Sequence, residues 1–508
     1  MGSFEMKTLL ESYNVNADKV AAQVKIWSIK GESVPLYEIK MPAFGRGTEA
    51  VILELIEELS SKVPLNIEEA TDPEKLEKIK QEFFSRIKEN VSKKMPEIKE
   101  AENDTIAGVL LHRMFGLGFI DVVMSDNWLE ELVINGSRQP ISVYHKKHGW
   151  CKTTETLGSE EKIYNLASQI GRKAGREINT LNPIMDAHLL TGDRVSSTLF
   201  PISTAGNTIT IRRFARNPWT PLHFLDPKVK TLSVEIAAFL WQAVQYELNI
   251  MVAGGTASGK TSMLNSICSF IPPKQRLISI EDTREINLPK ELEWNWVPLT
   301  TRNQNPEGRG EVTMLDLMVS SLRMRPDRII VGEGRRKQQA ETMFEAMHTG
   351  HSVYTTIHAD TVEQAKRRLL EPPIQMPKAE VEALQLILVQ YRDRRKGLRR
   401  ALELAEILSG SQEELQVNCL YRWRPRTDTF EKANDSIRVM EDLNLHTGMT
   451  PQEIKDDLKQ KQQVLRWMLK NSLMDISHVG KVMSSYYQEP DSFMDAVNKD
   501  KKPGDALK

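Results

Sequence analysis

The chain has 508 residues, of which 40% are hydrophobic and 27% are charged, and its formal net charge is −1. This length is too great for a single hydrophobic core and indicates about three domains of ordinary soluble composition. A near-neutral chain provides no overall basic field for nucleic acid, and no apolar run is long enough to span a membrane. We therefore expect no nucleic-acid partner.

The N-terminus and the cysteines indicate a cytoplasmic protein. The first residues contain no apolar signal region, and Met6 stands where a myristoylation motif beginning at Gly2 would have Ser or Thr. Cys151, Cys268 and Cys419 are odd in number and far apart in the sequence. We predict reduced structural thiols, since three cysteines cannot by themselves form a four-cysteine zinc site.

The N-terminal part of the chain predicts two segments. Residues 1–65 form a small mixed module, in which glycines at 45 and 47 precede an apolar-striped helix over 49–59. Residues 66–104 form a charged helical linker, because from Asp72 onward Lys and Glu surround spaced Leu, Ile and Phe. This pattern is typical of a solvated amphipathic helix, or of two around Pro96, and a partner-docking role is the alternative.

Residues 105–220 predict an α+β domain with an antiparallel sheet. Helical patterns cover 106–117 and 160–174, and short strand patterns bounded by turn residues cover 132–134, 141–144, 194–199 and 208–214. Arg194, Arg212 and Arg213 stand at strand ends, upstream of the glycine-rich loop described below. The planar, permanently charged guanidinium suits a γ-phosphate, so these arginines are candidate nucleotide ligands, and solvated strand ends are the alternative.

The segment 217–221, Asn-Pro-Trp-Thr-Pro, predicts a stiff connector that acts as a domain boundary or hinge. Beyond it, strand-like and helix-like runs alternate, which indicates a parallel α/β sheet in a domain over 221–440. Residues 441–508 are predicted to be a C-terminal helical extension, with helical periodicity over 451–487 and a frayed charged tail.

A glycine-rich loop carries the clearest functional signal. Residues 254–261 match G-x-x-x-x-G-K-[ST] and lie between an apolar strand-like run and a helix-like run, which is the context that a phosphate-binding loop requires. The glycines let the backbone close around phosphates, Lys260 reaches the β- and γ-phosphates, and the Thr261 hydroxyl ligates Mg²⁺. A chance glycine-rich turn is the alternative, which the flanking elements argue against. The residues expected to contact nucleotide are Gly254, Gly255, Thr256, Ala257, Ser258, Gly259, Lys260, Thr261 and Ser262.

Three further apolar runs end in functional side chains, at Glu281, Glu333 and His358. Because the carboxyl ends of parallel strands meet at one edge of a sheet, we expect all three to face the same phosphates as Lys260. One carboxylate can hold Mg²⁺ or its waters, and another can orient the attacking water. His358 can hydrogen-bond phosphate and report its presence, with a satisfied core histidine as the alternative.

The joint order of these motifs resembles the secretion ATPase family, which powers type II and type IV secretion, type IV pili and archaella. The matching segments are 254–261, 279–285, 322–333 and 349–359, and the likeness covers about residues 105–430. It implies a RecA-like P-loop motor domain preceded by a PAS-like α+β domain over 105–220. It also implies a hexameric ring that hydrolyses ATP between the two domains.

The resemblance assigns roles residue by residue. Lys260 and Thr261 fall in Walker A, Glu281 and Glu285 in the acidic box, Glu333 ends Walker B as the catalytic glutamate, and His358 lies in the His box. The arginines that help to close the site correspond to Arg194, Arg212 and Arg213. His348 and His351 are expected to be structural or coupling residues.

Some details resemble archaeal members most: the segments 372–377 and 399–406, and the lack of a four-cysteine zinc module. One detail departs from the family. After the catalytic glutamate the family usually has a hydrophobic residue and then Arg-Gly or Arg-Asp, whereas this chain has Gly334, Arg335 and Arg336. A glycine loosens the backbone beside the general base, and Arg336 adds a charge, so both concern the turnover rate rather than nucleotide binding.

We therefore predict a cytoplasmic hexameric ATPase at the inner face of the cell membrane. It uses ATP and Mg²⁺ to drive pilin-like subunits of a type IV pilus-like filament through a polytopic membrane platform protein. An archaellum motor or a type IV secretion ATPase is the alternative within the family. From other classes, the alternatives are a nucleotide-gated scaffold and a RecA-like nucleic-acid motor, which near-neutral charge and 6% aromatic content argue against.

Overall fold

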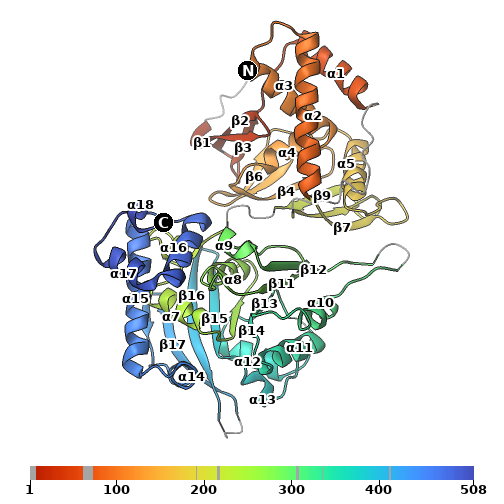
Figure 1. Ribbon diagram of the computed structural model, residues 1–508. Helices are drawn as coiled ribbons and strands as arrows, with labels where there is room; N and C mark the ends of the chain where they lie inside the picture. Colours follow the sequence, from red (N-terminus) through yellow and green to blue (C-terminus); the bar gives the residue numbers. More distant parts are fainter. Residues whose placement is uncertain are drawn as a thin grey trace. The chain divides into compact units, whose positions relative to one another are not determined.

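The computed structural model describes residues 7–60, 73–189, 192–213, 218–304, 308–334, 336–410 and 414–507. The chain divides into two compact units, Met1–Ala215 and Arg216–Lys508, which are described separately (Figure 1). Among the features named above, Gly2, Met6, Asn217, Arg335, the strand end at 214 and the linker residues 66–72 lie outside the described residues.

The first unit is built on one mostly antiparallel sheet with the order β1-β2-β3-β6-β5-β4-β9-β8-β7. Its strands are β1 (Lys7–Ala17), β2 (Val20–Ile29), β3 (Leu36–Lys40), β4 (Leu129–Asn135), β5 (Ser142–His145), β6 (Gly149–Thr153), β7 (Ile184–His188), β8 (Arg194–Thr198) and β9 (Thr208–Arg212). The sheet and its covering helices give the α+β class that the sequence predicts for this part of the chain.

The predicted small module at the N-terminus is part of this sheet. Strand β3 pairs in parallel with β6, through Leu36 opposite Lys152 and Tyr37 opposite Thr153. The buried side chains Val24 and Ile26 of β2 belong to the same hydrophobic core as Val143 of β5. The strands β1 to β3 therefore extend the sheet of the following domain.

The helices of this unit are α1 (Arg46–Ser60), α2 (Pro73–Lys94), α3 (Glu100–Met114), α4 (Phe119–Met124) and α5 (Glu160–Lys173). The segment predicted to be a solvated linker contains α2 and the start of α3, on either side of Pro96. Phe83, Ile87 and Val91 of α2, spaced four residues apart, are buried against Ile106 and Leu110 of α3. The apolar stripe thus belongs to a three-helix core with α1, because each helix needs a partner for its apolar face.

The second unit is built on a nine-stranded sheet with the order β12-β11-β13-β14-β10-β15-β16-β17-β18. Its strands are β10 (Ile250–Gly254), β11 (Leu277–Glu281), β12 (Trp296–Thr300), β13 (Arg328–Val331), β14 (Ser352–Ile357), β15 (Leu386–Asp393), β16 (Leu398–Leu408), β17 (Gln416–Arg424) and β18 (Thr429–Lys432). In this order, each neighbouring pair from β12 through β11, β13, β14 and β10 to β15 is parallel. Strands β15, β16, β17 and β18 form an antiparallel meander.

Helices cover both faces of the parallel part, so every residue of β10, β11, β13 and β14 is buried. The helices of this unit are α6 (Pro221–Leu225), α7 (Val234–Gln245), α8 (Lys260–Cys268), α9 (Lys290–Glu293), α10 (Met314–Ser321), α11 (Lys337–His348), α12 (Val362–Leu370), α13 (Lys378–Val381), α14 (Arg438–Thr447), α15 (Pro451–Lys470), α16 (Ile476–Gln488), α17 (Pro490–Asn498) and α18 (Pro503–Ala506). Strand β10 lies in the middle of the sheet, and β14 separates it from β13. This confirms the predicted α/β class with a RecA-like core.

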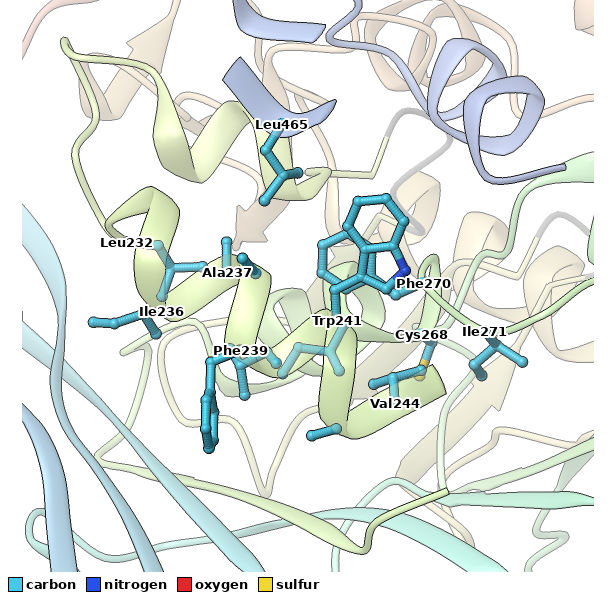
Figure 2. Close-up of a cluster of buried hydrophobic side chains, with 14 of the residues drawn as sticks. Leu232, Ile236, Ala237, Phe239, Trp241, Val244, Cys268, Phe270, Ile271 and Leu465 are labelled. Carbon is cyan, nitrogen blue, oxygen red and sulfur yellow. The ribbon is translucent and has the colours of Figure 1, made fainter. Parts of the chain in front are cut away.

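The C-terminal helices are part of this unit's core, although the sequence predicts a separate extension. Figure 2 shows Trp241 of α7 beside Phe270, with Leu465 of α15 in the same cluster. The two aromatic rings stack at 5.3 Å with an angle of 4° between their planes. The Trp241 indole donates to the Tyr487 hydroxyl at 2.8 Å, which in turn donates to the Phe270 carbonyl at 2.7 Å.

Two further features concern the cysteines, as candidates for a disulfide, and the helices, as candidates for a membrane span. Cys151, Cys268 and Cys419 are free thiols, and the first two are buried. No helix among the described residues combines the length and the apolar character needed to cross a bilayer.

A buried ion pair joins α15 to this core. The side chain of Lys461 is fully buried, pairs with Asp457 one turn earlier, and lies 5.4 to 5.8 Å from the ring centres of Trp241, Tyr246 and Tyr486. Burial lowers the pKa of Lys461 to about 8, whereas the Asp457 carboxylate favours the charged form. Asp457 also accepts a hydrogen bond from the Gln242 amide at 2.7 Å.

Removing the partner of this buried cation should destabilise the second unit. We expect Asp457→Ala to lower the free energy of unfolding by about 3 kcal/mol, because it leaves the Lys461 ammonium buried without its counter-ion. Asp456→Ala is the matched control, since this neighbouring carboxylate is half exposed. Denaturant titration of the full chain measures both, and equal effects would contradict the role given to the pair.

Candidate functional site

The glycine-rich loop joins β10 to α8. Gly259 precedes the helix with φ +93°, and Ala257 has φ +58°, so the loop turns through the left-handed region at both positions. A Cβ atom at Gly254 would lie 2.5 Å from the Gln390 carbonyl oxygen of β15 and 2.5 Å from the Ser258 hydroxyl. The close approach of β15 therefore requires glycine at the start of the loop.

Polar groups in the loop fit an anion. The Ser258 hydroxyl is buried and has no hydrogen-bond partner among the described residues, and the first N–H groups of α8 begin directly after it. The Lys260 ammonium is folded onto the loop, where it donates to the carbonyls of Gly254 at 2.9 Å and Gly255 at 3.1 Å. An ammonium and helix N–H groups at one turn form a phosphate-binding cradle.

Lys260, His358 and Glu333, three of the four side chains that the sequence predicts at one site, come together. The Lys260 Nζ lies 3.3 Å from the His358 Nδ1, and the His358 Nε2 lies 3.5 Å from the Glu333 Oε1. The Thr356 hydroxyl donates to the Gly332 carbonyl at 2.6 Å and links the ends of β13 and β14 just before His358 and Glu333. The carboxylate of Glu333, the ammonium of Lys260 and the imidazole of His358 thus lie at the carboxyl edge of three neighbouring strands.

Glu281 lies at the end of β11, where it is 2% exposed. Its Oε1 accepts the N–H groups of Glu285 at 2.8 Å and Ile286 at 3.0 Å, while its Oε2 is buried without a partner among the described residues. Burial raises the pKa of Glu281 to about 7, against the lowering effect of the two backbone donors. An unpaired carboxylate oxygen fits an oxygen-preferring cation such as Mg²⁺ or its water.

The three predicted arginines lie in the first unit. Arg194 pairs with Asp186, its Nε donating at 3.0 Å. Arg213 donates to the Asp126 carbonyl and, at 2.7 Å, to the Asn127 side chain. In the sheet, Arg212 lies opposite Arg194 on β8. Their role as nucleotide ligands stays a prediction.

The remaining predicted positions lie around α11. His348 pairs with Glu380 at 3.0 Å, and His351 lies 3.1 Å from the Thr349 hydroxyl. Both histidines close the end of this helix, which agrees with a structural role. Gly334 has open space where a Cβ would be, and Arg336 is the residue that precedes α11.

The structure places two further residues against the loop, and sequence analysis predicts neither of them. The Gln390 backbone packs against Gly254, and its side-chain oxygen is buried without a partner among the described residues. Arg399 donates from its Nε to the Ala257 carbonyl at 3.2 Å. Both contacts depend on the register of β15 beside β10, in which Gln390 lies opposite Gly254. Local sequence patterns do not indicate this register, so sequence analysis could not predict the contacts.

This sheet, loop and set of strand-end side chains define a RecA-like P-loop protein. Residues 190–396 match the sequence model of the family described as "Type II/IV secretion system protein". "Uncharacterized protein MJ0900" of Methanocaldococcus jannaschii is 32% identical over 416 residues, which are 80% of this chain and 74% of that protein. "Type IV secretion system protein PtlH" of Bordetella pertussis is 30% identical over 258 residues, or 47% of this chain and 75% of PtlH.

The chain therefore belongs to the type II/IV secretion system protein family, a family of secretion ATPases, which confirms the family predicted from the motifs. Among solved structures, the Yersinia pseudotuberculosis ATPase DotB is 19% identical, with a TM-score of 0.42, over 72% of this chain and 93% of DotB.

The raised pKa of Glu281 predicts a pH-dependent stability. Glu281 stabilises the fold fully below pH 4.5. This contribution is lost as the pH rises towards 7, because over this range the unfolded chain releases the proton while the folded protein still holds it. We expect Glu281→Gln, which stays neutral, to be more stable than the natural protein by about 3 kcal/mol above pH 7 and equal to it near pH 4.5.

Thermal unfolding of both proteins between pH 4.5 and 8, in metal-free buffer, tests this dependence. Asp282→Asn is the control, since Asp282 is the exposed neighbour of Glu281. Parallel pH profiles for the natural protein and Glu281→Gln would contradict the buried, protonated carboxyl.

Proposed function

We propose that this protein is a motor ATPase that hydrolyses ATP to power the assembly or secretion of type IV pilus-like filament subunits. The observation that carries the proposal is the contact chain from the Lys260 ammonium through His358 to Glu333 beside the phosphate loop. A base, a phosphate-reporting histidine and a phosphate-binding cation at one strand edge are the parts that γ-phosphoryl transfer to water requires.

The hydrolytic step follows from these positions. Glu333 orients a water and accepts its proton as the water oxygen attacks the γ-phosphorus, and the bond to the β–γ bridging oxygen breaks. Lys260 leaves the carbonyls of Gly254 and Gly255 and stabilises the charge that develops on the phosphate oxygens. His358, between these two side chains, hydrogen-bonds the γ-phosphate and is positioned to distinguish ATP from ADP.

Mg²⁺, when bound, neutralises phosphate charge during the transfer. The Thr261 hydroxyl and the unpaired Glu281 Oε2 are the groups that would hold it or its waters, and both are oxygen ligands of the kind that Mg²⁺ prefers. The backbone N–H groups of Glu285 and Ile286 fix the Glu281 carboxyl through its other oxygen.

The working form is a homohexamer at the inner face of the cell membrane, where it moves a polytopic platform protein and, through it, pilin-like subunits. Arg194, Arg212 and Arg213 help to close the nucleotide site. The likeness to MJ0900 of Methanocaldococcus jannaschii supports an archaeal type of family member, as the sequence details predict. The name of the PtlH relative favours a type IV secretion ATPase as the alternative.

A nucleotide-gated scaffold is the second candidate. Glycine at 334 allows more backbone conformations beside Glu333 than another residue would, and Arg336 adds a charge two residues further on. Such a scaffold binds ATP with little turnover, so a hydrolysis assay separates it from a motor.

Removing the loop cation should abolish turnover. We expect Lys260→Ala to lower Mg²⁺-dependent ATP hydrolysis by about 10²- to 10³-fold, because the developing charge loses its ammonium partner. Phosphate release from the purified chain measures this. Lys459→Ala, at a position 70% exposed on α15, is the control and should hydrolyse ATP normally. Near-normal hydrolysis by Lys260→Ala would contradict the assignment of this loop as the nucleotide site.

Glu333→Gln should separate binding from hydrolysis. The amide cannot accept a proton, so we expect turnover to fall by about 10²- to 10⁴-fold while ATP binding persists. Glu341→Gln, half exposed on α11, is the control. Turnover per chain that rises with protein concentration would support an assembling motor. ATP binding without turnover in both the natural protein and Glu333→Gln would favour the scaffold.

A further inference from the structure

The hairpin formed by β15 and β16 lies beside the phosphate loop. Strand β15 runs parallel to β10, with Gly254 opposite Gln390, so the turn at 394–397 emerges at the same edge of the sheet as the loop. Arg399 is the second residue of β16, on the returning arm of this hairpin. The hairpin thus brings a cation to the loop from the side of β10 opposite to β14.

The Arg399 side chain lies along the loop. Its Nε donates to the Ala257 carbonyl at 3.2 Å, and its Cδ is 3.6 Å from the place where a Cβ on Gly259 would stand. Among the described residues the guanidinium makes this one hydrogen bond, although it carries five N–H donors. Most of its donor capacity therefore remains for a ligand.

Neighbouring contacts fix the backbone from which Arg399 projects. Its carbonyl accepts the Thr231 hydroxyl at 3.2 Å, and the N–H of Ala401 donates to the Thr231 carbonyl at 2.9 Å. Arg400, which points to the opposite face of the strand, is buried and donates to both carboxylate oxygens of Asp428 at 2.7 and 3.0 Å. Hydrogen bonds from Arg400 hold the pKa of the Asp428 carboxyl well below its usual range.

We propose that Arg399 binds the α- and β-phosphates of the nucleotide from the outer side of the loop. This inference rests on the proposed function. The groups suited to the γ-phosphate, Glu333 and His358, come from β13 and β14 on one side of β10, whereas Arg399 comes from β16 on the other. A guanidinium binds a phosphate more strongly than it binds a neutral carbonyl oxygen, because its hydrogen bonds to phosphate are charge-assisted and bidentate.

Titration of the full chain with ADP and with ATP, by calorimetry, tests this role. We expect Arg399→Ala to weaken both nucleotides equally, by about tenfold to a hundredfold, because both carry the two phosphates concerned. Arg395→Ala is the matched control, since Arg395 lies exposed in the turn of the same hairpin, and it should bind both nucleotides normally.

Two further variants separate ligand binding from a purely structural clamp on the loop. Arg399→Gln keeps a donor for the Ala257 carbonyl but has no charge, so a clamp predicts normal affinity and our proposal predicts the loss. Arg399→Lys should recover part of the affinity, and inorganic pyrophosphate should lose affinity for Arg399→Ala in the same proportion as ADP.

Unchanged affinity in Arg399→Ala, full rescue by Arg399→Gln, or a loss confined to ATP would overturn the inference. If Lys260→Ala abolishes binding while Arg399→Ala does not weaken it, only this inference fails. If Lys260→Ala binds and hydrolyses normally, the proposed function itself fails.

Discussion

The position of the Lys260 ammonium depends on three strands at once. The loop carbonyls of Gly254 and Gly255 extend from β10, His358 follows β14, and Glu333 follows β13. These strands are neighbours in the order β13-β14-β10, and their parallel pairing places Ala253 beside Ile357. A slip of one residue in either pairing would turn the strand-end side chains to the opposite face, so the sheet register is what assembles the site.

The loop itself is held in an unusual backbone conformation. Ala257 takes φ +58°, which costs a non-glycine residue about 1 kcal/mol or more. Contacts on either side maintain it: the Lys260 ammonium spans two carbonyls at the start of the loop, and Arg399 holds the carbonyl of Ala257. Such local strain is retained where it keeps backbone N–H groups turned towards a ligand.

Features that depend on a short stretch of chain could be predicted from the sequence. The loop and the side chains that end three apolar strands belong to this kind, because a buried parallel strand and its polar end lie in adjacent residues. Features that depend on contacts between segments far apart in the sequence could not be predicted in this way. The pairing of β3 with β6 joins residues more than a hundred positions apart, and Trp241 packs against helices from the far end of the chain.

Glu281 and Arg399 show the same limit within the site. The sequence places Glu281 at a strand end but does not distinguish it from Asp282 or Glu285 in burial, and only the structure shows that backbone N–H groups enclose one of its oxygens. In the sequence, nothing distinguishes Arg399 from the other arginines of a basic hairpin. Its contact with Ala257 exists because β15 pairs with β10, which no local pattern indicates.

The two sides of β10 differ in the contacts that support their side chains. On the β16 side, the backbone around Arg399 is bonded to Thr231, just before α7, and α7 carries the Trp241 that packs against the C-terminal helices. On the β13 side, Glu333 is followed by a glycine with open space around it. If Arg399 binds the nucleotide as proposed, its phosphate contact acts on a strand that is hydrogen-bonded to this packed core. Under the proposed function, loss of the γ-phosphate is therefore expected to act first on the contact between Glu333 and His358, and not on the contact between the hairpin and the loop.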